Sequence, residues 1–385
     1  MALDPDTFKQ LIDTIRRFVE TTLMPAEASV DENDEVPEHI MEGMRQLGMF
    51  GLTIPVEYGG LGLNSEEEVQ VWFEFSRAAP AYRSVCSSNN GIGSQGIIID
   101  GSEEQKKRYL PLMATGEIVG SFCLTEPGSG SDAKSLRTIA RRDGGDYVIN
   151  GSKRFISNAP FAKVFTVMAR TNADDGSDAG VSAFFIDADT PGITLGEPYR
   201  KMGQRGAKAC DVYFDDVRVP ASTLIGGVEG RGFKTAMKVL DRGRLGMAAG
   251  CVGVAQRLIE ESVRYATARK QFGSPIADFQ LIQAMIADSV TDQYAAHSMI
   301  MSAAAARDAG QRVTKQASMC KYFASEMVGR IADRAVQIHG GAGYISESAV
   351  ERLYRDVRVF RLYEGTSQIQ QLVIARDTLR EMVEY

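Results

Sequence analysis

The chain contains few histidines. Only three occur among its 385 residues, His39, His297 and His339, and they stand far apart with no metal-ligand or triad-like spacing. Zinc sites and serine hydrolases need imidazole groups in such patterns, so neither chemistry is indicated and no metal ligands are assigned. Acid–base chemistry at neutral pH is therefore expected to depend on a carboxylate.

Cysteines are also few and follow no pattern. Their number is odd, and no two of them have the spacing of a disulfide framework or a metal site. We therefore expect reduced, mostly buried side chains that act as small apolar groups. The five are Cys86, Cys123, Cys210, Cys251 and Cys320.

No targeting or membrane-spanning segment is visible. Acidic residues stand at Asp4 and Asp6 in place of a basic secretory stretch, and no apolar run approaches the roughly 20 residues that cross a bilayer. The sequence predicts no stable membrane association and, by default, a cytoplasmic location, although a mature mitochondrial matrix protein without its targeting segment would look the same. The net charge of −7 argues against nucleic acid as a partner, but a local basic patch could still hold a nucleotide phosphate.

Apolar spacing divides the chain into three zones, which we place at residues 1–117, 118–224 and 225–385. The first is helical, with Pro25 expected to end its first helix, and Ser65 with Glu68 expected to form a capping box. The second has short β-rich runs between turn residues, and the third returns to long helices. The β-rich runs are 146–150, 165–168, 181–186 and 211–214, and the long helices are 241–267, 281–309 and 313–339. This order predicts a mainly α protein with an inserted β-domain.

Three stretches combine glycine with groups that can do chemistry. Residues 123–132 mix glycines with Thr and Ser hydroxyls, which suits the close approach of a phosphate or a polar heterocycle. Residues 337–344 carry adjacent glycines at the end of a long helix. Residues 361–370 bring Glu364, Gly365 and Thr366 together just before a final helix.

In this order and separation, the three stretches resemble the acyl-CoA dehydrogenase family, and the resemblance spans essentially the whole chain. It implies an N-terminal helical domain, a middle β-barrel-like domain and a C-terminal four-helix bundle. It further implies FAD as cofactor, an acyl-CoA substrate, an electron-transfer flavoprotein as electron acceptor, and a homotetramer built as a dimer of dimers. The reaction would be α,β-dehydrogenation to the 2-enoyl-CoA, in fatty acid or amino acid catabolism.

The resemblance also assigns FAD contacts by motif position. Ser131 would lie near the pantetheine as well as the flavin, and Phe155 and Ser157 stand where many relatives have Trp and Thr. One group would line the flavin: Phe122, Leu124, Thr125, Ser131, Phe155 and Ser157. A second group would hold the pyrophosphate and adenine of a neighbouring subunit's FAD or close over it: Arg269, Gln271, Phe272, Gln337, Gly340, Gly341, Thr366 and Gln368.

Glu364 matches the family's catalytic base, and Tyr363 and Gly365 flank it at the substrate. Some relatives carry the base two positions after the residue that matches Asp241. This chain has Gly243 there, which cannot act as a base, so the assignment falls on Glu364. Arg244 resembles the arginine that supports CoA and the base loop. A plainer alternative makes Asp241 and Arg244 helix-surface charges.

Tyr82-Arg83-Ser84 is similar to the glutaryl-CoA dehydrogenase branch, whose arginine pairs with the distal carboxylate of the substrate. The alternative is that Arg83 is a solvated helix residue. That branch also carries a glutamate seven positions before the arginine, where this chain has Ser76, so decarboxylation is in doubt. Three functions stay open: a simple acyl-CoA dehydrogenase, a dicarboxyl-CoA dehydrogenase with or without loss of CO₂, and an oxygen-using or non-catalytic flavoprotein.

Overall fold

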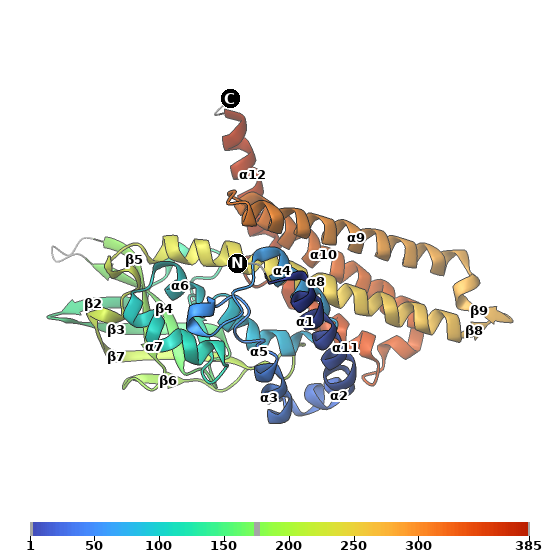
Figure 1. Ribbon diagram of the computed structural model, residues 1–385, viewed down its shortest axis with the longest axis horizontal. Helices are drawn as coiled ribbons and strands as arrows, with labels where there is room; N and C mark the ends of the chain where they lie inside the picture. Colours follow the sequence, from blue (N-terminus) through green and yellow to red (C-terminus); the bar gives the residue numbers. More distant parts are fainter. Residues whose placement is uncertain (1–2, 173–177, 384–385) are drawn as a thin grey trace.

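The computed structural model describes residues 3–172 and 178–383. Figure 1 shows short helices, then a sheet at one end of the molecule, then long helices that reach the opposite end. The predicted order of helices, sheet and helical bundle is confirmed, while the zone boundaries stay a prediction. No helix in the described ranges combines the length and the apolar character needed to cross a membrane. The helices before the sheet are α1 (Pro5–Phe18), α2 (Met24–Asn33), α3 (Glu38–Gln46), α4 (Ser65–Phe75), α5 (Pro80–Asn90), α6 (Gln95–Asp100) and α7 (Glu103–Ala114).

Two local predictions in the N-terminal helices were wrong. Pro25 does not end the first helix, because the chain passes through a π-helical turn at Val19–Leu23 and continues as α2. Such a widened turn accommodates a proline, which lacks an N–H and clashes with the preceding turn of a regular helix. The capping box is shifted by one residue: the Asn64 side chain accepts from the Glu67 N–H, and Glu67 accepts from the Asn64 N–H.

The middle zone forms one mixed sheet within the described residues. Its order is β1-β4-β2-β3-β7-β6, and β5 pairs with β4. The β3–β7 ladder shifts register between Lys153 and Ile156, which marks a bulge in β3. The strands are β1 (Gly120–Cys123), β2 (Ile139–Asp143), β3 (Asp146–Ser157), β4 (Val164–Asn172), β5 (Asp178–Asp187), β6 (Ile193–Leu195) and β7 (Ala209–Pro220).

Helix α8 connects the sheet to the C-terminal bundle. It begins at Gly232, earlier than the predicted position 241, because its first turns pack on the sheet: a Cβ on Gly232 would lie 2.4 Å from the Ala183 N. Ala236 on the same helix shares a core cluster with Phe185 of β5. The C-terminal elements are α8 (Gly232–Ala268), β8 (Lys270–Gln271), β9 (Ser274–Pro275), α9 (Gln280–Asp308), α10 (Thr314–His339), α11 (Ala349–Val357) and α12 (Ser367–Val383). All five cysteines are buried, as predicted.

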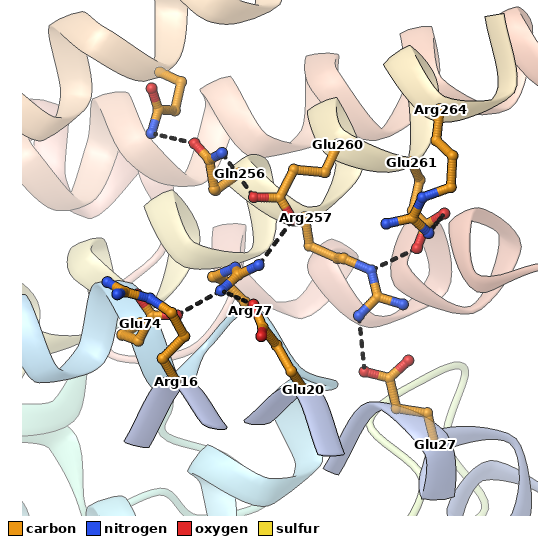
Figure 2. Close-up of polar contacts among 11 residues, drawn as sticks. Arg16, Glu20, Glu27, Glu74, Arg77, Gln256, Arg257, Glu260, Glu261 and Arg264 are labelled. Atoms are coloured by element: carbon orange, nitrogen blue, oxygen red, sulfur yellow. Dashed lines mark hydrogen bonds and ion pairs between the residues drawn. The ribbon is translucent and has the colours of Figure 1, made fainter. Parts of the chain in front are cut away.

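Ion pairs join the N-terminal helices to α8 (Figure 2). The Arg77 guanidinium lies 3.1 Å from Glu20, 2.5 Å from Glu74 and 3.1 Å from Glu260 on α8, and its side chain is 14% exposed. Each carboxylate comes from a different helix, so one side chain ties three segments together. Exposed pairs contribute little to stability, but a shielded group shared by several partners contributes more.

We expect Arg77→Met to destabilise the protein by about 2 kcal/mol, because it leaves Glu260 without its ion-pair partner and Glu74 with Arg16 alone. The measurement is the thermal unfolding midpoint of the FAD-loaded protein. Arg264→Met is the matched control, since Arg264 pairs with Glu261 at 3.0 Å but its side chain is 69% exposed. Equal midpoints for the two variants would show that the Arg77 network does not stabilise the fold.

Candidate active site

A cavity of about 490 Å³ lies where the sheet, α5, α8 and the turn before α12 meet. It brings together residues that are far apart in the sequence. The lining residues that the sequence had singled out are Arg83, Phe122, Leu124, Thr125, Ser131, Phe155, Ser157, Gly243, Arg244, Tyr363, Glu364 and Gly365.

The remaining predicted residues do not line this cavity. The β8–β9 hairpin lies at the opposite end of the molecule from the sheet (Figure 1), and its tip carries Phe272, which is 96% exposed. The end of α10 packs beside this hairpin: Ile338 of α10 and Ile276, which directly follows β9, belong to the same small core cluster. The fold thus gathers at a second place most of the residues predicted for a neighbouring subunit's cofactor: Arg269, Gln271, Phe272, Gln337, Gly340 and Gly341. Thr366 and Gln368 lie at the start of α12, next to the cavity but outside its lining.

The bulge in β3 directs an aromatic ring into the cavity. Phe155 has a φ of +58°, in the left-handed region, and its side chain is left 60% exposed at the cavity wall. A residue other than glycine adopts this conformation only where its surroundings hold it. The bulge therefore fits the prediction that Phe155 faces a planar ring, with the Ser157 hydroxyl two positions further along the strand.

A buried ion pair fixes the loop that carries Leu124 and Thr125. The Lys153 ammonium is fully buried and lies 2.7 Å from Glu126. Glu126 also accepts from the N–H groups of Arg137 (2.6 Å) and Thr138 (2.9 Å). Burial would raise the pKa of Glu126, but Lys153 and these bonds hold that pKa below its usual value. The loop that forms this part of the cavity wall is thus anchored to β3.

Glu364 lies on a strained turn and points at α8. Its φ is +54°, which costs a residue with a side chain about 1–2 kcal/mol. Its buried Oε2 atom has no hydrogen-bond partner in the described parts of the chain. A Cβ built on Gly243 would lie only 2.9 Å from this oxygen. The glycine therefore leaves room for the carboxylate at the point where some relatives carry their own base.

Arg244 is buried and held in place near Glu364. It is 5% exposed, and its guanidinium lies 2.6 Å from Asp241, which in turn accepts from the Thr314 hydroxyl at 2.8 Å. Burial lowers the pKa of Arg244, while Asp241 and Glu364 oppose that shift. The alternative that Arg244 is a helix-surface charge is wrong, and Asp241 acts as its partner at the edge of the cavity.

Arg83 is also buried, so the alternative of a solvated arginine is wrong. It is 8% exposed, and its guanidinium lies 5.0 Å from the centre of the Trp72 ring. A Cβ on Gly250 would lie 3.1 Å from Arg83 Cδ and 3.4 Å from Ser76 Oγ, so both side chains rest on the bare backbone of α8. In the described chain, Arg83 Nε and Ser76 Oγ are buried without hydrogen-bond partners. Two unsatisfied polar atoms thus lie together beside the cavity, one of them in a cation.

Sequence reasoning missed Trp72, Glu68 and Arg242 as cavity residues. The Trp72 indole N–H donates to Glu68 at 3.3 Å, and Arg242 lies 3.6 Å from the same carboxylate. The sequence offered one signal, since Trp72 is the only tryptophan of the chain. The burial of Glu68 on the same helix became visible only in the structure.

Three family models match almost the whole chain. The acyl-CoA dehydrogenase N-terminal domain matches residues 5–117, the middle domain residues 121–217 and the C-terminal domain residues 230–379. The chain belongs to the acyl-CoA dehydrogenase family. It is an oxidoreductase of that family, its fold is the three-domain fold predicted from the sequence, and its cofactor is FAD.

Relatives and solved structures extend this comparison. The chain is 42% identical to a 3-(aryl)acrylate reductase of Clostridium sporogenes, over 95% of this chain and 96% of that one. It is 43% identical to a subunit of the caffeyl-CoA reductase–Etf complex of Acetobacterium woodii, over 91% and 92%. Among solved structures, a glutaryl-CoA dehydrogenase bound to glutaryl-CoA has a TM-score of 0.91 at 35% identity, over 98% of this chain and 96% of that one. An acyl-CoA dehydrogenase of Bacillus anthracis complexed with FAD has a TM-score of 0.91 at 33% identity, over 100% and 69%.

The residues of the cavity fit a flavin. Phe122, Leu124 and Phe155 offer apolar surface to a planar ring, and Thr125 and Ser157 offer hydroxyls to its polar edge. Gly130 also lines the cavity, and a Cβ placed on it would have no neighbouring atom of the described chain within 4 Å. These side chains could hold FAD in the cavity that Glu364 also lines.

Proposed function

We propose that the chain catalyses α,β-dehydrogenation of an acyl-CoA thioester to the 2-enoyl-CoA. The observation that carries this proposal is the Glu364 carboxylate, whose buried Oε2 has no protein partner and faces a cavity shared with the flavin-side residues. Glu364 would remove the α-proton as general base, while bound FAD supplies the acceptor for the β-hydride. Arg244, held by Asp241, would steady the CoA end of the substrate and the base turn, which is formed by Tyr363, Glu364 and Gly365.

The backbone of the base turn offers a donor for the developing enolate charge. Within the described residues, the Glu364 N–H makes no hydrogen bond. A free N–H beside the base can stabilise negative charge on the thioester oxygen, where preorganised donors are most effective. One residue would then supply both the base and a donor to the carbonyl.

A second observation supports a substrate with an acidic group at the far end of its acyl chain. The Arg83 guanidinium is buried with no carboxylate partner in the described chain, and the neighbouring Ser76 Oγ is buried without a hydrogen-bond partner. A buried cation without an anion is costly, and a substrate carboxylate would remove that cost. The similarity to a glutaryl-CoA dehydrogenase structure agrees with this substrate class.

Loss of CO₂ is not part of the proposal. Ser76 lies beside Arg83 against Gly250, where the glutaryl branch has a glutamate. A serine hydroxyl does not ionise near neutral pH and cannot replace a carboxylate in proton transfer. We therefore expect a dicarboxyl-CoA to be oxidised with its distal carboxylate retained.

The test is a panel of acyl-CoAs mixed anaerobically with the FAD-loaded enzyme, with loss of the oxidised-flavin absorbance as the signal. Glutaryl-CoA and other dicarboxyl-CoAs should reduce the flavin faster than butyryl- or octanoyl-CoA, and the glutaryl product should keep its carboxylate. If butyryl- or octanoyl-CoA is far better, the acidic substrate is excluded while the dehydrogenase stands. If no acyl-CoA reduces the flavin, the dehydrogenase itself is excluded.

An electron-transfer flavoprotein is the proposed redox partner, since one relative is a subunit of an Etf complex. Several relatives bear reductase names, and the same residues serve the reverse reaction when Glu364 returns the proton to the α-carbon. Mixing substrate-reduced enzyme with air separates this proposal from an oxidase. Slow reoxidation supports the flavoprotein partner, and rapid release of peroxide would contradict it.

We also propose that the protein assembles as a homotetramer. Phe272, Leu281 and Tyr294 on the β8–β9 hairpin and α9 are large side chains more than two-thirds exposed, as expected of a surface that a second copy covers. Arg269 and Gln337 would then reach the FAD of that copy. Light scattering of the purified protein measures the assembly directly.

A further inference from the structure

The carbonyl groups of the base turn are held from the bundle side. Glu364 and Gly365 both have left-handed φ values, +54° and +91°. The Lys321 ammonium donates to the Gly365 carbonyl at 2.7 Å, and the Gln370 amide donates to the carbonyls of Glu364 at 3.2 Å and Gly365 at 3.0 Å. A Cβ on Gly365 would lie 2.6 Å from Gln370 Nε2, so the turn is pressed closely against these donors.

Lys321 and Gln370 are both fully buried, and neither lines the cavity. Lys321 comes from α10 and Gln370 from α12. Their hydrogen bonds to the turn are made to the backbone carbonyls of Glu364 and Gly365.

The charge of Lys321 has no other direct partner. In the part of the chain that the structure describes, its ammonium makes no ion pair, and its bond to the Gly365 carbonyl is its one hydrogen bond. Burial lowers the pKa of Lys321 to about 8, with Cys251, Glu364 and Glu326 opposing the shift and Arg244 adding to it. The amine is thus still mostly protonated at pH 7. An apolar side chain would fill the same space without the cost of a buried charge, so packing alone does not explain a lysine here.

We propose that Lys321, together with Gln370, is a positioning residue that holds Glu364 in its strained conformation above Gly243. This inference rests on the proposed role of Glu364 as base. A charge-assisted bond to one carbonyl and a forked amide bond to two fix the turn, and with it the carboxylate and the free Glu364 N–H. The strained turn would otherwise relax, since its residues adopt other conformations at lower energy.

The test compares Lys321→Met with Lys315→Met, the same change on the same helix at a lysine that pairs with Glu381 outside the cavity. We expect Lys321→Met to lower the limiting rate of flavin reduction about 100-fold, because misplacement of a catalytic group by about 1 Å has effects of that size. The KM for the acyl-CoA and the FAD content should change less than about threefold, whereas a general loss of structure would reduce all three. Lys315→Met should match the wild type.

Gln370→Leu is a second variant, which removes the other two bonds without touching the lysine, and it should slow reduction in the same way. A crystal structure of either variant gives a readout independent of activity: Glu364 should leave its left-handed φ. An unchanged turn, or a wild-type reduction rate in both variants, overturns the proposal. If no acyl-CoA reduces the wild type, the proposed function fails, and the φ of Glu364 in the variants still decides whether Lys321 positions the turn.

Discussion

Glu364→Gln should lower the rate of flavin reduction by acyl-CoA about 10,000-fold, the upper range for removal of a general base. The amide has nearly the same shape as the carboxylate, so it fits beside Gly243 without a cavity or a clash. The Glu364 N–H and the left-handed turn should both remain, because Lys321 and Gln370 bind the backbone and not the carboxylate. The measurement is anaerobic stopped-flow reduction with the best substrate of the acyl-CoA panel.

Two controls make this result specific. Dithionite should reduce the flavin of Glu364→Gln as completely as that of the wild type, because chemical reduction needs no base. Glu104→Gln makes the same change on the exposed first turn of α7 and should leave the rate unaltered. If flavin reduction in Glu364→Gln is within about tenfold of the wild-type rate, another residue is the base.

Arg83→Met should reverse the substrate preference. For a dicarboxyl-CoA, loss of a buried charge pair of this kind costs about 4 kcal/mol, so kcat/KM should fall about 1,000-fold. For a straight-chain acyl-CoA, kcat/KM should be unchanged or higher, because the variant no longer buries an unpaired guanidinium beside Trp72. The measurement is kcat/KM for glutaryl-CoA and for an apolar acyl-CoA of similar length.

Arg83→Lys separates charge from shape. It keeps the cation but loses the planar fork that binds a carboxylate through two parallel bonds, so the glutaryl-CoA reaction should recover only in part. If Arg83→Met slows both substrates equally, Arg83 supports the fold around Trp72 and Gly250 and does not select the acyl group.

Most of the fold was predicted from the spacing of apolar residues along the chain. Helical and strand periods depend on neighbouring residues, so the three zones and the long bundle helices could be recognised without a structure. The errors arose where contacts with distant segments altered the local structure. The π-helical turn before Pro25 and the one-residue shift of the capping box depend on packing of Val19 and Leu23 and on the Leu3 N–H that donates to Glu67 at 2.6 Å.

The sequence by itself determined the family, the cofactor and the candidate base, because short motifs such as Tyr363-Glu364-Gly365 place those groups side by side along the chain. Only the tertiary structure decided that Arg83 is buried against Trp72, and that an ammonium 44 positions before Gly365 donates to the Gly365 carbonyl. Those facts depend on which helices meet α8, and contacts between distant segments leave no period or spacing in the sequence. A charged residue on a helix looks the same in sequence whether it faces water or a substrate, and burial alone separates the two.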